Sequence, residues 1–254
     1  MDRTLAALVK PLKALRYNTR SKAFLQRGEH GLLFELYPNE EIDRQISLNG
    51  IYERRYLRFL ESLILDGAVI LDVGANIGNH ALYLSRKASS VHCFEPNPRA
   101  YERLERNVAL SQVTNVTVHR YGLGDRDETI RFAEVAGNLG MTRFSEAGNL
   151  ELQIKRGDDV ISMPTIDFIK IDAEGMEASV LAGLRDTIAV HRPIVAFEFN
   201  GEHWDRIIRA LPGYQIFEPV FPKGLALLSK GETPELRPVG PEKRWYEGLI
   251  ALPN

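Results

Sequence analysis

Two acidic residues in this chain each end a short apolar run. Asp72 follows Val69-Ile70-Leu71, and Glu95 follows the run Val-His-Cys-Phe at 91–94, which places the acids 95 − 72 = 23 residues apart. A carboxylate at a strand end can accept hydrogen bonds from ribose hydroxyl groups, and a spacing of about 20 residues after the first strand is typical of such sites. The pair therefore indicates binding of a nucleoside-containing ligand.

The apolar runs before these acids are typical of strands buried on both faces of a sheet, because such strands lose the alternation of polar and apolar residues. A helical pattern follows each run, over residues 79–87 and over residues 98–110, and the second pattern opens with Pro98. Two consecutive strand–helix units predict a parallel, doubly wound α/β sheet. Ligands of such sheets bind outside the carboxyl ends of the strands, where both acids fall.

Glycines after the first strand define the loop beside the acids. Gly74 and Gly78 allow a tight turn, but Asn76 stands where the dinucleotide pattern G-x-G-x-x-G has its middle glycine. Asp72 would repel a pyrophosphate at this helix start, whereas it could hold the amino group of a methionine-like moiety through a bridging water. The loop therefore favours S-adenosylmethionine over NAD. A nicotinamide-dependent enzyme and a plain βαβ turn are the alternatives.

Several longer motifs resemble those of the FkbM-type S-adenosylmethionine-dependent methyltransferases. They are G-x-Y-E-x (50–54), LDVGANIGNHALYLS (71–85), FEPNPRAYERLERN (94–107), GLGD (122–125), NLG (138–140) and IDFIKIDAEGMEASVLAGL (166–184). The resemblance spans roughly residues 45 to 200. One segment departs from the family, because Arg156-Gly157-Asp158-Asp159 stands where a Thr-Leu-Asp usually precedes the fourth strand.

The resemblance implies a Rossmann-like methyltransferase fold of the α/β class. Its sheet would be mainly parallel and seven-stranded, with helices on both faces. The last two strands would run over residues 214–219 and 246–251 and would close the sheet as an antiparallel edge.

Length and composition agree with one such domain. The 254 residues contain no Pro/Gly/Ser-rich linker, so we expect a basic helical leader with short strands over residues 1–45 and the methyltransferase domain over residues 46–254. A formal net charge of −2 gives no general attraction to nucleic acid. The single cysteine, Cys93, rules out an internal disulfide, and the chain has no apolar run of about 18 residues. These features predict a cytoplasmic protein.

The first 27 residues are strongly basic. Seven Lys and Arg residues against Asp2 give a local charge of 7 − 1 = +6, and leucines are interleaved with them. Such a stretch could contact the inner face of an anionic membrane peripherally or dock a partner. It could equally cap its own domain or a neighbouring subunit, and the oligomeric state stays open.

The strand ends and the resemblance together assign a set of cofactor-binding residues. The third strand leads into Gly122 and Leu123, beside which the adenine would lie, and Asp125 could accept from its amino group or only form a turn into a hairpin at 129–133. The periodicity fails between residues 133 and 160, so we expect a loop-rich acceptor-binding lid there. The cofactor set is Asp72, Gly74, Ala75, Asn76, Gly78, Asn79, Glu95, Pro96, Asn97, Gly122, Leu123, Asp125 and Asp172.

The fourth strand ends in Asp172, where the transferred methyl group would point. A hydroxyl acceptor must lose a proton as it attacks that methyl group, so a nearby carboxylate or imidazole is the expected general base. Asp172 is the first candidate, Glu174 could orient it or bind an acceptor hydroxyl, and Lys170 could hold it ionised. His203, after the fifth strand, is the alternative base. Lys170 and Glu174 could instead form a structural ion pair, and His203 could be a surface residue at a helix start.

The same strand ends permit Mg²⁺ without favouring it, through the oxygen-rich set Asp172, Glu198 and Asn200. Exclusion narrows the acceptor atom to oxygen. Residues 172–175 lack the Asn/Asp-Pro-Pro-aromatic turn of nitrogen methylation, and Cys93 lies on the wrong strand for carbon methylation.

We therefore expect S-adenosylmethionine-dependent O-methylation of a small-molecule or glycan acceptor. The resemblance implies a hydroxyl of a sugar, a glycolipid or a natural product. A catalytically silent cofactor-binding or scaffolding protein of the same fold is the alternative.

Overall fold

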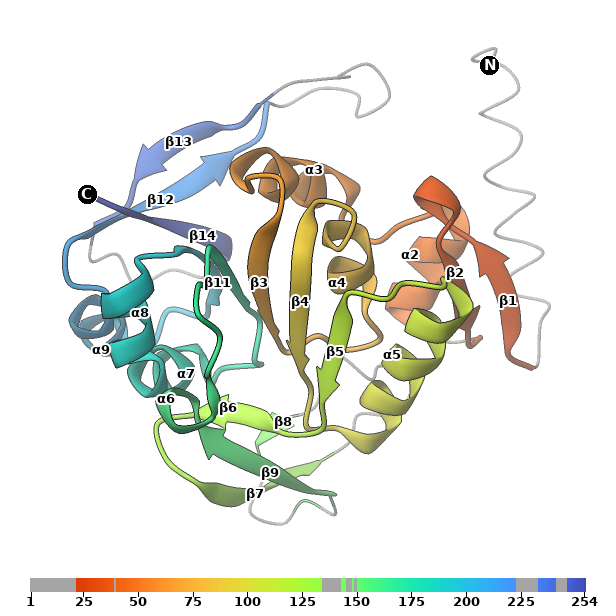
Figure 1. Cartoon of the computed structure of the whole chain (residues 1–254), viewed down its shortest axis with the longest axis horizontal. Helices are drawn as coiled ribbons and strands as arrows, with labels where there is room; N and C mark the ends of the chain where they lie inside the picture. The colour runs from red at the N-terminus through yellow and green to blue at the C-terminus, as the bar shows by residue number, and fades with distance from the viewer. Residues whose placement is uncertain are drawn as a thin grey trace.

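The computed structural model describes residues 22–38, 40–133, 143–144, 148, 150–222, 233–240 and 246–254. Within these ranges an eight-stranded sheet forms the centre of the molecule (Figure 1). Its strands are, in spatial order, β13 (Glu235–Pro238), β12 (Tyr214–Val220), β14 (Tyr246–Pro253), β11 (Ile194–Phe199), β10 (Phe168–Ile171), β3 (Ala68–Val73), β4 (Ala88–Phe94) and β5 (Val116–His119). From β11 to β5 all neighbours are parallel, as the continuous apolar runs predict.

The far end of this sheet is antiparallel. Strand β14 lies between β11 and β12 and runs antiparallel to both, which confirms the predicted closing strands. The eighth strand, β13, pairs with β12 and extends the predicted seven-stranded sheet by one edge strand. Its residues, Glu-Leu-Arg-Pro, carry no apolar alternation, so the sequence pattern offered no signal for it.

Helices connect the strands. They are α2 (Glu41–Asn49), α3 (Arg54–Leu63), α4 (Asn79–Leu84), α5 (Pro98–Leu110), α6 (Gly157–Val160), α7 (Glu177–Gly183), α8 (Arg185–His191) and α9 (Trp204–Ala210), with a 3₁₀ turn at Glu29–Gly31. Helix α5 has the predicted bounds, because the Asn97 side chain caps its start by accepting from the N–H of Arg99 and Pro98 follows the cap. The prediction for α4 was too long, since this helix ends at Leu84 rather than at Lys87.

Two apolar clusters cover the two faces of the large sheet. On one face, Ile70 and Phe168 pack with side chains of α3, α4 and α5. On the other face, Leu71 and Ile169 pack with side chains of α7, α8 and α9. Successive strand residues point to opposite faces, so the even-numbered residues of β3 and β10 point toward α3 and α4.

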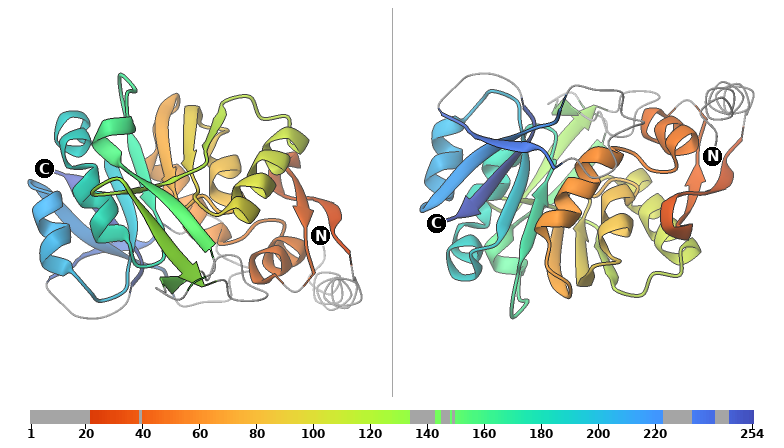
Figure 2. Two further views of the ribbon diagram at one scale, coloured as in Figure 1. Left: turned by 90° about the horizontal axis from the view of Figure 1, so that it is seen from below. Right: turned by 90° about the horizontal axis from the view of Figure 1, so that it is seen from above.

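A second, smaller sheet lies beside the large one, below it in Figure 1 and also visible in Figure 2. Among the described residues its strands follow the order β6 (Gly122–Gly124), β9 (Leu150–Arg156), β7 (Glu128–Ala133) and β8 (Arg143–Phe144). The predicted lid falls here. Residues 150–156 form a regular strand, and most of the remaining predicted lid lies outside the described residues.

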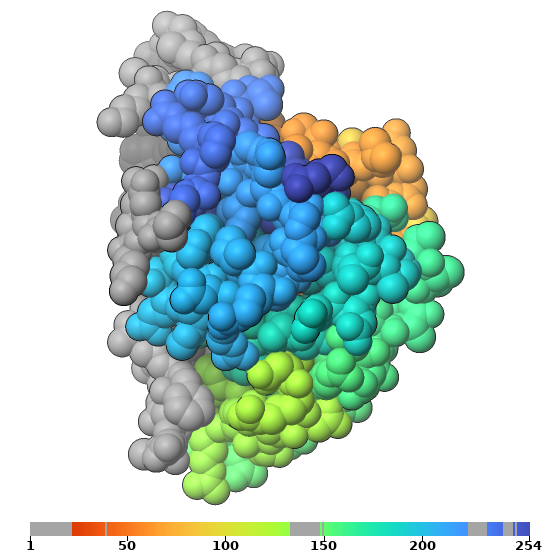
Figure 3. Space-filling model, turned by 90° about the vertical axis from the view of Figure 1, so that its left-hand side faces the viewer, coloured from red at the N-terminus to blue at the C-terminus, as the bar shows by residue number. Residues whose placement is uncertain are grey.

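The segment that departs from the family pattern has a structural role. The carboxylate of Asp158 accepts from the backbone N–H and the hydroxyl of Thr187, at 2.9 and 2.8 Å, and so anchors the first turn of α8. Figure 3 shows this end of the molecule, where the C-terminal strands lie above helices α8 and α9.

An N-terminal hairpin, β1 (Phe24–Arg27) with β2 (Leu33–Leu36), forms an antiparallel pair beside α5 (Figure 1). The prediction of a basic helical leader with membrane or partner contact falls mainly on residues 1–21, which lie outside the described residues. Among the described helices, none is long and apolar enough to cross a membrane.

Candidate functional site

A cavity of about 490 Å³ opens where the carboxyl ends of β3, β4, β10 and β11 meet helices α2, α3 and α4 and the small sheet. Each of the sequence motifs contributes residues to its wall, apart from the motif at 138–140, which lies outside the described residues. Its wall includes Gly74, Ala75, Asn76, Asn79, Glu95, Pro96, Asn97, Gly122, Leu123, Lys170, Asp172 and Glu174 among the predicted site residues.

The glycine loop after β3 approaches the end of β10 closely. Gly74 has a φ of 75°, and a Cβ atom there would overlap the carbonyl oxygen of Asp172. Gly78 has a φ of 87°, and a Cβ atom there would overlap the Leu104 side chain. Both positions therefore require glycine for conformation and for space. Asn76, between them, also has a positive φ of 49°.

Glu95 connects this loop to the start of α5. Its Oε2 accepts from the N–H of Asn76 and its Oε1 accepts from the N–H of Asn97, each at 2.9 Å. Burial raises the pKa of Glu95 to about 7, although both backbone donors act to lower it. A carboxylate with two of its lone pairs used keeps acceptor capacity for a bound hydroxyl group.

Two buried amide atoms beside Glu95 lack a hydrogen-bond partner among the described residues. They are the Oδ1 atom of Asn76, an acceptor, and the Nδ2 atom of Asn97, a donor. Buried polar groups are almost always paired, so these two atoms are available to a polar ligand that enters the cavity. The hydroxyl, amino and carboxylate groups of S-adenosylmethionine fit a site that offers a carboxylate, a free amide acceptor and a free amide donor.

Asn79 lines the same wall, but its amide is already used. Its Oδ1 accepts from the N–H of Tyr52 at 3.0 Å, and its Nδ2 donates to the Tyr52 carbonyl at 3.1 Å. The residue therefore ties the G-x-Y-E segment to the start of α4.

Asp72 and Lys170 form a buried ion pair on adjacent strands. They are register partners, they are 1% and 4% exposed, and the Nζ atom of Lys170 lies 3.2 Å from Asp72 Oδ1. Lys170 also lies 3.5 Å from Asp172 Oδ2 and donates to the carbonyl of Gly74. Burial acts to lower the pKa of Lys170, but the two carboxylates outweigh it and raise that pKa far above its usual value. Asp72 is not part of the cavity wall, and its carboxylate faces Lys170.

Carboxylates dominate the opposite wall of the cavity. Asp172 keeps 43% of its side chain exposed at the end of β10, and Glu198 follows on the next strand. The pKa of Glu198 is raised to about 7, first by burial and then by the negative charges of Asp172, Glu177 and Glu53. This wall is suited to hydrogen bonding with hydroxyl groups.

Helices α3 and α4 add residues that the sequence interpretation did not assign. Glu53 has a φ of 52°, and its carboxylate lies 3.1 Å from Nε2 of buried His80. Tyr56 also lines the cavity, and its hydroxyl lies against Gly248, where a Cβ atom would come within 2.6 Å. The quoted G-x-Y-E motif was the available signal for Glu53, and no spacing rule pointed to His80 or Tyr56.

Five predicted site residues do not line the cavity within the described part of the chain: Asp72, Gly78, Asp125, Asn200 and His203. Asp125 accepts from the Ser179 hydroxyl at 3.0 Å and pairs with Arg206 at 3.0 Å, so its carboxylate links the small sheet to α7 and α9. The His203 side chain is 56% exposed at the start of α9. The Oδ1 atom of Asn200 accepts from the N–H of Glu202 at 2.9 Å.

The possible Mg²⁺ set stays a prediction: Asp172 and Glu198 both line the cavity, and Asn200 follows β11 just beyond them. Within the described part of the chain, no three His, Cys, Asp or Glu side chains are grouped so that they could hold a metal ion.

Comparison with known proteins identifies the family. The model of the methyltransferase FkbM domain matches residues 72–216, a range that includes Asp72, Glu95 and Asp172. The chain is 32% identical over 174 residues to the hexuronic acid methyltransferase AglP of Haloferax volcanii, covering 66% of this chain and 71% of that protein. It is 28% identical over 188 residues to the 2-O-methyltransferase NoeI of Sinorhizobium fredii, covering 62% and 76%.

Among solved structures, a methyltransferase FkbM from Methylobacillus flagellatus aligns with a TM-score of 0.49 and 22% identity, over 79% of this chain and 46% of that one. Since the domain model covers more than half of the residues, the chain belongs to the FkbM family of methyltransferases.

Proposed function

We propose that this protein transfers the methyl group of S-adenosylmethionine to a hydroxyl oxygen of a sugar or another polyhydroxylated small molecule. The observation that carries the proposal is one cavity with two unlike walls: Glu95 with free amide atoms on one side, and a group of carboxylates around Asp172 on the other. The two named relatives, a hexuronic acid methyltransferase and a 2-O-methyltransferase, support oxygen as the acceptor atom and a sugar as the acceptor class.

On the cofactor side, the glycine loop and the start of α5 bind the nucleoside and amino-acid parts. Glu95 accepts from ribose hydroxyl groups, while Asn76 and Asn97 offer their free amide atoms. Leu123 and Gly122 form the wall next to the predicted adenine position. S-adenosylmethionine supplies an electrophilic methyl group when it is bound.

On the acceptor side, Asp172 takes the proton of the hydroxyl group that attacks the methyl carbon. The new C–O bond forms as the C–S bond breaks, and the sulfur keeps the electron pair. Lys170 stays protonated, and its Nζ atom lies 3.5 Å from Asp172 Oδ2, where it positions that side chain for the proton transfer. Glu53 and Glu198 line the same space and hydrogen-bond further acceptor hydroxyl groups.

Replacing Asp172 with asparagine is expected to leave cofactor affinity within about threefold of wild type and to lower turnover by about 10²–10⁴-fold. The amide keeps the shape of the side chain but cannot take the proton. Calorimetry with S-adenosylhomocysteine and transfer of labelled methyl to an acceptor panel measure the two quantities. Asp186→Asn is the matched control, because it makes the same change at an exposed position of α8. Wild-type turnover in Asp172→Asn would remove this residue from the mechanism.

Cofactor binding is expected to depend on pH through Glu95. Its pKa of about 7 in the free protein must fall when ribose hydroxyl groups donate to the carboxylate, so binding releases a proton below and near that pH. The dissociation constant should therefore rise as pH falls through about 7, by up to roughly tenfold per unit, and level off above about pH 8. Calorimetry in buffers of different ionisation enthalpy counts the proton, and Glu95→Gln should abolish the slope.

The same raised pKa acts in the opposite direction on the stability of the free protein. The contribution of protonated Glu95 to the free energy of unfolding is fully present below about pH 4.5, the ordinary pKa of the group. This contribution is lost as the pH rises through about 7, the pKa in the folded protein.

The test of the function is a panel of hydroxylated acceptors incubated with labelled S-adenosylmethionine, with products identified by mass spectrometry. Labelled methyl ethers are the expected products. Tight cofactor binding without transfer to any acceptor in the panel or in lysate would favour the silent, scaffolding alternative. Binding of NAD in place of S-adenosylhomocysteine would contradict the proposal.

A further inference from the structure

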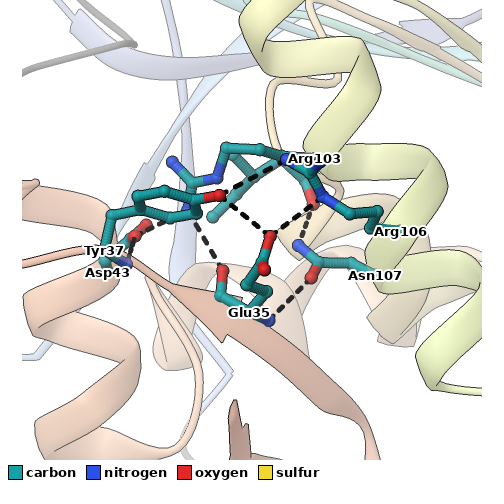
Figure 4. Close-up of polar contacts among 7 residues, drawn as sticks. Glu35, Tyr37, Asp43, Arg103, Arg106 and Asn107 are labelled. Carbon is teal, nitrogen blue, oxygen red and sulfur yellow. Dashed lines mark hydrogen bonds and ion pairs between the residues drawn. The ribbon is translucent and has the colours of Figure 1, made fainter. Parts of the chain in front are cut away.

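Asn107, on α5, connects the N-terminal hairpin to the glycine loop. The residue is fully buried, and its Oδ1 accepts from the N–H of Glu35 in β2 at 2.8 Å (Figure 4). Its Nδ2 donates to the carbonyl of Ile77 at 2.9 Å. Ile77 belongs to the loop between Gly74 and Gly78, whose residues line the cavity. One side chain thus holds both segments in a fixed relative position.

Hydrogen bonds to β4 and to the residue that follows it hold the first part of this loop. The N–H of Gly74 donates to the carbonyl of Phe94, and the N–H of Asn76 donates to Glu95. In the C-terminal half of the loop, the side chain of Ile77 is buried and its carbonyl accepts from the Asn107 amide. The N–H of Gly78 donates to the Ala75 carbonyl within the loop, and Asn79 is bonded to Tyr52. Without the Asn107 amide, a carbonyl in a buried setting would lose its partner.

A second connection joins the same elements. Asp43 of α2 and Arg103 of α5 are 1% and 3% exposed and pair at 2.5 Å, and the Asp43 carboxylate also accepts from the N–H of Tyr37, just after β2. The Arg103 guanidinium lies 4.5 Å above the Tyr37 ring (Figure 4). Helix α2 in turn contributes Glu41 and Ile42 to the cavity wall.

We propose that the N-terminal hairpin and α2 are a supporting part of the cofactor site, and that Asn107 is the positioning residue that transmits their support to the glycine loop. These elements lie outside the matched methyltransferase domain, which begins at residue 72. The inference rests on the proposed function in one respect, namely that the loop binds S-adenosylmethionine.

Two variants separate positioning from general stability. Asn107→Ala removes one hydrogen bond to the hairpin and one to the loop, whereas Ser111→Ala removes two hydrogen bonds to Leu33 of the hairpin and none to the loop. Both variants should unfold at lower temperature. At a temperature where both are folded, Asn107→Ala should weaken S-adenosylhomocysteine binding by about tenfold or more, and Ser111→Ala should stay within about twofold of wild type.

Hydrogen exchange of the free variants gives a readout that needs no ligand. The backbone amides of residues 74–79 should exchange faster in Asn107→Ala than in wild type. In Ser111→Ala their exchange rates should equal those of wild type. Equal changes in the two variants, or wild-type exchange and affinity in Asn107→Ala, would overturn the inference.

The unmodified protein provides a measurement should Asn107→Ala fail to fold. Coupling is reciprocal, so saturating S-adenosylhomocysteine should slow exchange in β2 but not in the remote edge strand β13. Unchanged exchange in β2 with the ligand bound would refute the coupling. If wild-type protein does not bind the ligand at all, the proposed function fails, and exchange of the loop in the two variants still decides the role of Asn107.

Discussion

Replacing Glu95 with alanine is expected to raise the dissociation constant for S-adenosylhomocysteine by about 100-fold or more. The carboxylate accepts two backbone N–H groups at 2.9 Å that fix the glycine loop against α5, and we assign it the ribose hydroxyl groups as well. Each hydrogen bond to a charged group contributes about 1.5–3 kcal/mol, and about 1.4 kcal/mol is a tenfold change in affinity. Losing both the hydrogen bonds that anchor the loop and the contacts with the ligand therefore lowers the affinity by more than two factors of ten.

Calorimetric titration measures this change, and two variants control it. Glu102→Ala removes an exposed carboxylate from the adjoining helix α5 and should bind like wild type. Glu95→Gln keeps the size of the side chain but not its charge, so its affinity should lie between those of wild type and Glu95→Ala. An affinity of Glu95→Ala within about threefold of wild type would refute the ribose assignment.

Replacing Lys170 with methionine is expected to lower the free energy of unfolding by about 3–5 kcal/mol. The substitution leaves the Asp72 carboxylate, which is 1% exposed, without the cation at 3.2 Å that compensates its burial. In a domain of this size that loss corresponds to a fall in melting temperature of roughly 10 °C. Urea denaturation followed by circular dichroism gives the free energy directly.

The double variant Asp72→Asn with Lys170→Met identifies the cause. Removing both charges should recover much of the lost stability, because an uncompensated buried charge destabilises more than a neutral pair. Arg131→Met serves as the exposed control, since its pair with Glu151 lies in solvent and should contribute less than about 1 kcal/mol. A double variant no more stable than Lys170→Met alone would show that the loss comes from packing rather than from charge.

The Asp72–Lys170 pair also explains why two acids in similar sequence positions differ in role. Asp72 is the penultimate residue of β3, and Glu95 directly follows the neighbouring parallel strand β4. Asp72, however, faces Lys170, which lies on the adjacent strand β10. Glu95 faces two backbone N–H groups and the cavity. From the sequence, both acids were predicted to contact the cofactor, because the cation that pairs with Asp72 lies 98 residues away in the chain.

Local features were well predicted where neighbouring residues decide the structure. The bounds of α5 follow from Asn97 and Pro98 at its start, and strand β11 matches its apolar run at 194–199. The glycine loop and Glu95 also lie at the cavity as expected. Features that depend on distant partners were not predicted, such as edge strand β13 and the pairing of Asp125 with Arg206.

By itself, the sequence determined that two strand–helix units place a glycine loop and acids at one edge of a parallel sheet, because periodicity, caps and glycine conformations act over a few residues. Only the tertiary structure decided which of those polar groups face the cavity and which face each other. The pairing of β10 with β3 brings Lys170 to Asp72, and the packing of α5 brings Asn107 to the glycine loop. Such contacts arise from strand register and helix packing between residues far apart in the chain, and no local spacing encodes them.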